Sequence, residues 1–214
     1  MTPTRSTILR AALLGTVLAL TFAGAARAQS RAPSEPEAPA RSAATLRGRH
    51  SLSLGVGLLA SADVAPGVAS VHGVAGGISY LYWPGAAVAL EVSANAHAAE
   101  ARSAVSASVT SLLFGVSWYP ELSSAAVVRP YVGVAAGPYV GSEADGFRAS
   151  ASARSVLGAR LGGGVDLFPT HALRLGVRGA YHLVPDFDAP VGSLESASGP
   201  QLSLEVGWVF GRGG

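Results

Sequence analysis

Residues 173–183 read LRLGVRGAYHL, and this stretch decides the fold. Its large apolar side chains share one parity, at Leu173, Leu175, Val177, Tyr181 and Leu183. The positions between them hold Arg174, Gly176, Arg178 and His182. An amphipathic helix would instead place apolar residues three and four positions apart, so the period of two predicts a β-strand.

The polarity of this strand is opposite to that of a strand in a water-soluble barrel. The large aliphatic residues share one face, whereas the charged residues share the other face with small residues such as Gly176. The interior of an eight-stranded barrel is only wide enough for side chains, so small and charged residues suit the lumen. The aliphatic face then contacts lipid, which predicts a transmembrane barrel strand.

The same alternation recurs along the chain. The predicted strands lie at about 50–60, 69–83, 86–97, 105–119, 127–140, 153–168, 172–183 and 201–210. Three of them end on an aromatic residue followed by proline, which cannot donate to a strand ladder: Trp83-Pro84, Tyr119-Pro120 and Phe168-Pro169. With a last strand that ends on Trp208 and Phe210, these marks predict four hairpins. We therefore expect an all-β, eight-stranded antiparallel transmembrane β-barrel.

The connections predict which end of this barrel faces the periplasm. Short turns follow the three aromatic–proline marks, whereas the connections near 61–68, 98–104, 141–152 and 184–200 carry Asp, Glu, Ser and Gly. Short turns are typical of the periplasmic side, and aromatic rings prefer the membrane–water interface. We expect a periplasmic aromatic rim that consists of Trp83, Trp118, Tyr119, Phe168, Trp208 and Phe210. Strand parity directs Trp118, Trp208 and Phe210 toward lipid, and the other three inward or into a turn.

The N-terminal region predicts export. Arg5 and Arg10 precede an apolar run from Ala11 to Ala23, and Ala26-Arg27-Ala28 forms a small-x-small cleavage site, so residues 1–28 are expected to be a cleaved signal peptide. Residues 29–49 are rich in Pro, Ala, Arg and Ser, which favours a disordered periplasmic leader over a tether to the cell wall or a partner. The barrel domain is expected to span residues 50–211.

Composition excludes several classes of protein. Removal of the three signal-peptide arginines leaves 12 of the 15 basic residues against 13 acidic ones, without the one-sided basic surface of a nucleic-acid binder. The chain has no cysteine, which excludes disulfides and thiolate metal sites. It is 49% hydrophobic but only 13% charged, and after residue 28 it has no apolar run long enough for a transmembrane helix. A membrane β-barrel explains this combination.

Three stretches resemble a known group of proteins: VRPYVGVAAGPYVG (128–141), LGARLGGGVDLFP (157–169) and LSLEVGWVF (202–210). They look like the small, porin-like eight-stranded outer-membrane β-barrels of Gram-negative bacteria, which include the membrane domain of outer membrane protein A. The resemblance implies a location in the outer membrane, with its lipids as surroundings. It also implies recognition by the barrel-assembly machinery through the C-terminal strand, with Phe210 as the signal aromatic, although Gly211–Gly214 follow it. We expect a monomer.

Charged residues on the lumen face are the candidate functional residues, and they are Glu91, Arg160, Asp166, Arg174, Arg178 and Glu205. A buried charge without a partner is strongly unfavourable, so three arginines and three acids are expected to form ion pairs. A hairpin centred on Thr170 would place Asp166 opposite Arg174, and Arg178 can reach Glu205. The favoured interpretation is a plugged lumen, and the alternative is a narrow path for protons or ions.

The histidines were considered for catalysis and metal binding. His182 with Asp186 or Asp188 and a loop serine could imitate a rim-located lipid-modifying enzyme, but no G-x-S-x-G motif is present. A metal site from His97, His182 and Glu100 has no recognised ligand spacing, so no metal and no cofactor are expected. We expect a non-enzymatic protein with a structural or surface-interaction role. A narrow channel for small solutes or protons is the alternative, and the enzyme is a less favoured one.

Overall fold

The computed structural model describes residues 46–60, 72–99, 105–120, 127–145, 148–189, 191 and 196–211. The predicted signal peptide and residues 29–45 of the predicted leader lie outside this range. The strands are β1 (His50–Ala60), β2 (His72–Tyr82), β3 (Val88–Ala99), β4 (Val105–Trp118), β5 (Val128–Asp145), β6 (Arg148–Leu167), β7 (Leu173–Leu183) and β8 (Gly199–Phe210). Among the described residues, no helix is long and apolar enough to cross a membrane.

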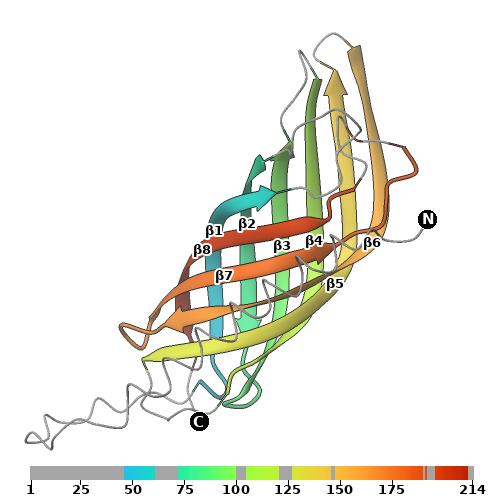
Figure 1. Ribbon diagram of the computed structural model, residues 1–214. Helices are drawn as coiled ribbons and strands as arrows, with labels where there is room; N and C mark the ends of the chain where they lie inside the picture. Colours follow the sequence, from blue (N-terminus) through green and yellow to red (C-terminus); the bar gives the residue numbers. More distant parts are fainter. Residues whose placement is uncertain are drawn as a thin grey trace, which may run out of the picture. The chain divides into compact units, whose positions relative to one another are not determined.

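The strands form a closed antiparallel barrel in chain order, as Figure 1 shows. Each strand pairs with its neighbours in sequence, and β8 returns to pair with β1 from His50 opposite Phe210 to Leu59 opposite Gln201. The predicted fold class is therefore confirmed, because the alternating pattern located all eight strands.

Side-chain exposure follows the predicted inversion of polarity. On β1, Leu54 and Leu58 are 64% and 63% exposed, whereas Ser51 and Ser53 are 0% and 1% exposed. The same alternation on β8 exposes Trp208 and buries Glu205. A barrel whose outer surface is aliphatic and whose interior is polar suits lipid rather than water.

The hairpin of β5 and β6 corrects one prediction. Residues 141–152 were expected to be a polar outer loop, but β5 has 18 residues and β6 has 20, and they pair from Val128 opposite Leu167 to Asp145 opposite Arg148. A register shift between Ala144 and Asp145 marks the outer end of this ladder. Backbone hydrogen bonds need no apolar side chains, so a strand outside the lipid layer leaves no alternating apolar pattern in the sequence.

The centre of the β6–β7 hairpin differs from the predicted one by one residue. The strands place Asp166 opposite Gly176, not opposite Arg174, because the hairpin is centred one residue later than Thr170. The hydroxyl of Thr170 accepts hydrogen bonds from the backbone N–H groups of Ala172 (3.3 Å) and Leu173 (3.1 Å), and this local turn holds the longer connection.

The end of the predicted leader belongs to the barrel. Leu46 is only 3% exposed, and the backbone N–H of Gly48 donates to the carbonyl of Trp83 at 2.7 Å. The N–H of Trp83 donates in turn to the carbonyl of Arg49 at 3.0 Å. Residues 46–49 therefore pack against the barrel beside Trp83, and the boundary of the folded part lies at least four residues earlier than predicted.

Two apolar clusters lie inside the barrel at its two ends. The first, which we call the floor, consists of Leu46, Leu81, Trp83, Ala89, Tyr119 and Tyr131, with Phe168 packed against it. The outer cluster consists of Ala107, Val109, Leu113, Ala135 and Tyr139 from β4 and β5, and of Val184, Phe187, Val191 and Ala197 from the β7–β8 connection. The 184–200 segment was expected to be a polar outer loop, but its described apolar residues fold inward, and its last two residues belong to β8.

Candidate functional site

The candidate site is the charged layer between the two apolar clusters. The structure brings all six predicted lumen residues together as one chain of ion pairs, although they come from β3, β6, β7 and β8. Every one of them is less than 8% exposed. All six residues occupy inward-facing positions of their strands, which the alternation in the sequence predicts. Their side chains therefore meet in the lumen.

Two arginines of β7 connect the chain of ion pairs. Arg174 contacts Asp166 through Nε at 2.9 Å and Glu205 through Nη2 at 2.8 Å. Arg178 contacts the same Glu205 through Nε at 3.0 Å and Glu91 through Nη1 at 2.8 Å. The series of ion pairs ends at Arg160.

Arg160 contributes the remaining pair. Its Nη2 lies 2.6 Å from Oε1 of Glu91, which also accepts from Arg178, so one carboxylate oxygen on β3 holds two guanidinium groups. Since Glu91 stands on β3 and both arginines stand on β6 and β7, these contacts cross the lumen. Three positive and three negative groups leave the layer neutral, so each buried charge has a counter-charge that offsets part of its desolvation cost.

Hydroxyl groups complete the layer, a role that the sequence pattern does not indicate. The Tyr119 hydroxyl donates to Oδ2 of Asp166 at 2.8 Å, and the Tyr131 hydroxyl accepts from Nε of Arg178 at 2.9 Å. Ser53 accepts from Nη1 of Arg174 at 2.8 Å. The inward parity of Tyr131 and Ser53 was the available signal, but parity alone does not identify a hydrogen-bond partner.

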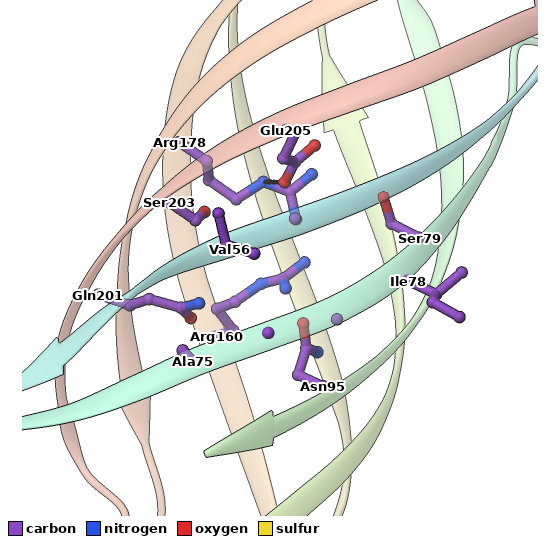
Figure 2. A pocket seen from close by; sticks show the side chains of 13 residues that line it. Val56, Ala75, Ile78, Ser79, Asn95, Arg160, Arg178, Gln201, Ser203 and Glu205 are labelled. Atoms are coloured by element: carbon purple, nitrogen blue, oxygen red, sulfur yellow. Dashed lines mark ion pairs between the residues drawn. The ribbon is translucent and has the colours of Figure 1, made fainter. Parts of the chain in front are cut away.

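The wall opposite the arginines is built of small residues. Figure 2 shows the side chains of Arg160 and Arg178 beside β1 and β2, where a cavity of about 20 Å³ is lined partly by Gly55, Ala75 and Gly77. A polar cavity of this size holds about one water molecule. This cavity therefore leaves room for about one water molecule beside the two arginines.

A second polar group lies on the outer side of the charged layer. His182 is fully buried, and its Nδ1 and Nε2 lie 2.8 Å from the Tyr139 hydroxyl and 2.5 Å from Oε1 of Gln201. His97 packs edge-on against His182 with ring centroids 5.5 Å apart. We call His97, His182, Tyr139 and Gln201 the histidine layer.

This geometry does not pair His182 with Asp186 or Asp188, the acids of the rim enzyme that the sequence suggested as an alternative. Both ring nitrogens of His182 face Tyr139 and Gln201, whereas Asp186 and Asp188 are exposed. Among the described residues no group of three or more His, Cys, Asp or Glu side chains could hold a metal ion. Glu100, the third residue of the considered metal site, lies outside the described residues.

The six residues of the predicted rim all lie at the end of the barrel where β1 begins and β8 ends, but they divide into two sets. Trp118, Trp208 and Phe210 are 53%, 65% and 42% exposed on the lipid face. Trp83 and Tyr119 are buried in the floor, where the Trp83 ring packs against Tyr119 and Phe168 with centroids 6.2 and 6.4 Å apart.

His50 joins this rim where the barrel closes, which the sequence did not indicate. Its ring stacks on Tyr82 at 4.9 Å and on Phe210 at 5.6 Å, so β1, β2 and the last residue of β8 meet around it. Its Nδ1 lies 2.6 Å from the Tyr80 hydroxyl. These contacts tie the seam between β1 and β8 to β2.

Solved structures share this architecture. Neisserial surface protein A (NspA) is 17% identical to the chain, with a TM-score of 0.59 over 76% of this chain and 96% of that one. The chain has the fold of the small outer-membrane β-barrels. The outer membrane protein OprG from Pseudomonas aeruginosa agrees, with a TM-score of 0.56, 13% identity and coverage of 78% of this chain and 98% of that one. No family model and no curated protein matches the sequence.

Proposed function

We propose that this chain is an integral outer-membrane β-barrel protein with a plugged lumen and a structural or surface-interaction role. The aliphatic outer face supports the membrane location, since residues such as Leu54, Leu157 and Val206 are 64%, 75% and 57% exposed. Such a face would be unstable in water over the whole circumference of a barrel. The fold of NspA and OprG supports the choice of the outer membrane.

The observation that carries the plugged lumen is the ion-pair layer. Arg160 and Arg178 reach across the barrel to Glu91, and Arg174 is 0% exposed between Asp166 and Glu205. The floor closes the lumen on one side of this layer, and the outer cluster closes it on the other. A solute would have to break ion pairs and displace packed aromatic rings to pass.

The proposed partners follow from the same surfaces. Outer-membrane lipids contact the aliphatic face, and Trp208 and Phe210 on β8 present exposed aromatic rings to the barrel-assembly machinery. We propose a monomer that binds no nucleic acid. We also propose no enzymatic activity, because the nitrogens of His182 are bonded within the histidine layer. Lipid analysis of cells that carry His182→Gln should then show no change.

Two measurements test this proposal. A folded membrane barrel migrates differently on unboiled and boiled gels and resists protease in intact cells, whereas a soluble periplasmic protein shows neither property. In planar bilayers the purified barrel should give no reproducible single-channel steps. Clear steps would overturn the plugged lumen but not the membrane location, which the gel and protease assays test separately.

The alternative function is a narrow channel for small solutes or protons. The water-sized cavity beside Arg160 and Arg178 is the observation that favours it. If a path exists, Arg178→Ala should alter the conductance, whereas replacement of the exposed Arg47 at the periplasmic end should leave it unchanged. If the lumen is plugged, neither variant conducts in regular steps.

A further inference from the structure

The described apolar residues of the β7–β8 connection enter the outer end of the lumen instead of standing away from it. Val184 and Phe187 are 5% and 6% exposed, and Val191 and Ala197 are 1% and 2% exposed. All four belong to the outer cluster, which includes inward residues of β4 and β5. We call the described residues 184–189, 191 and 196–198 the cap.

A glycine on β5 leaves the space into which the cap packs. A Cβ atom at Gly141 would lie 2.6 Å from Cγ2 and 3.3 Å from Cβ of Val191, so only glycine leaves room for this valine. Val191 therefore fits against one defined position of the wall.

Polar contacts hold the two ends of the cap together and to the wall. The hydroxyls of Ser196 and Ser198 each donate to the carbonyl of Val184 at 2.7 Å. On β6, Nη1 of Arg154 donates to the carbonyl of Ala189 at 3.0 Å. Pro185, Asp186 and Asp188 are exposed, so the other side of the cap is polar and faces water.

The histidine layer adjoins the cap and includes a buried side chain without a hydrogen-bond partner among the described residues. On β7, Val184 is the next inward position after His182, so the cap adjoins the histidine layer directly. His97 is 4% exposed, and among the described residues neither of its ring nitrogens has a hydrogen-bond partner. The buried hydroxyl of Ser93 on the same strand also has none. Buried groups of this kind are normally hydrogen-bonded, often to water.

We propose that the cap is a displaceable lid that docks at Gly141 and lifts to connect the histidine layer with the outer medium. Water and small polar molecules then reach His97, while the ion-pair layer and the floor keep the rest of the lumen closed. This inference goes beyond the proposed function, because it holds whether or not the lumen conducts. It assigns the outer half of the lumen a role separate from the plug.

Thiol accessibility tests the lifting of the cap. The chain has no cysteine, and among the described residues the His97 ring has no hydrogen-bond partner, so His97→Cys places one reactive thiol in the histidine layer. A small, membrane-impermeant thiol reagent is added to the full-length barrel in vesicles with its outer end exposed, and the modified fraction is followed by mass spectrometry. We expect slow but measurable modification of the single-cysteine protein.

Cap variants then separate an opening lid from a fixed one. In the His97→Cys background, Gly141→Ala or Phe187→Ala should raise the modification rate by about tenfold or more, since each weakens the docked state. Gly179→Ala is the matched control, because a Cβ there meets no atom within 4 Å, and it should leave the rate unchanged. Equal rates in all proteins would overturn the proposal, and so would no reaction in any folded protein while the denatured protein reacts.

A disulfide tests the docked position independently. The 3.3 Å between a Cβ at position 141 and Cβ of Val191 is close to the Cβ separation of disulfides, roughly 3.5–4.5 Å. The double variant Gly141→Cys with Val191→Cys should therefore form an intramolecular disulfide under mild oxidation. Gly179→Cys with Val191→Cys should not form one. Failure of the first pair in a protein that retains its heat-dependent gel shift would overturn the docking of the cap at Gly141.

Discussion

Replacement of Arg174 with alanine is expected to lower the free energy of unfolding by about 3–5 kcal/mol, because it leaves buried carboxylates without their main counter-charge. Arg174 is 0% exposed and contacts Asp166 at 2.9 Å, Glu205 at 2.8 Å and Ser53 at 2.8 Å. After its removal Glu205 keeps Arg178, whereas among the described residues Asp166 keeps the Tyr119 hydroxyl as its one side-chain partner. The two hydrogen bonds that Arg174 donates to Ser53 and Glu205, at about 1.5–3 kcal/mol each, give a similar range of about 3–6 kcal/mol.

Reversible urea unfolding of the barrel in lipid vesicles, followed by the heat-dependent gel shift, measures this loss. Arg47 is exposed, so Arg47→Ala is the control and should change stability by less than about 0.5 kcal/mol. The double variant Arg174→Ala with Asp166→Asn removes one charge of each sign, so its loss should be smaller than the sum of the single losses by about 1–3 kcal/mol. A loss for Arg174→Ala no larger than that for Arg47→Ala would refute the reasoning.

Three further substitutions test other parts of the barrel by the same unfolding measurement. Gly164→Ala should destabilise by about 1–3 kcal/mol because its Cβ would overlap the carbonyl oxygen of Val177, whereas Gly179→Ala, which meets open space, should be nearly neutral. Leu46→Ala should lower the free energy of unfolding by about 2–5 kcal/mol if the residues before β1 belong to the floor. An unchanged free energy of unfolding would indicate that these residues belong to the leader. Leu54→Arg on the lipid face should cost about 2–4 kcal/mol in bilayers if this position is at mid-depth, and a stable variant would contradict lipid contact there.

The strands and the charged layer could be predicted because both depend on parity. A lipid-facing position needs an aliphatic side chain, and a lumen position needs a small side chain or a charged one with a partner. The alternation of residues along a membrane strand therefore predicts which face is directed toward lipid. Both Glu91 and Arg160 could therefore be placed in the lumen without knowledge of the register between their strands. Their contact partner could not be assigned, because Arg160 reaches Glu91 from β6 to β3 across the lumen rather than along a strand pair.

The outer half of the barrel was harder to predict because it lies beyond the constraint of the lipid. The outer parts of β5 and β6 alternate small and polar residues, as in SASARS (150–155), and such a pattern fits a loop or a strand equally well. The cap shows the opposite difficulty. Phe187 and Val191 are isolated apolar residues between Asp, Pro, Gly and Ser, and only the cavity formed by distant residues of β4 and β5 explains their burial.

The absence of lysine from the chain is consistent with how the charged layer is built. Arg178 contacts Glu91 through Nη1 and Glu205 through Nε, and a planar guanidinium can serve two carboxylates with different N–H groups at fixed angles. The single ammonium group of a lysine is compact, so it would hold one of these carboxylates and leave the other with fewer partners.

We therefore expect Arg178→Lys to lower the free energy of unfolding by about 1–3 kcal/mol although the charge is retained. The loss should be smaller than that for Arg174→Ala, because Glu91 keeps Arg160 and Glu205 keeps Arg174. A lysine variant as stable as the parent would mean that net charge alone organises the layer. A measured loss would instead show that the layer depends on the bridging geometry of arginine, since charge balance is identical in the two proteins.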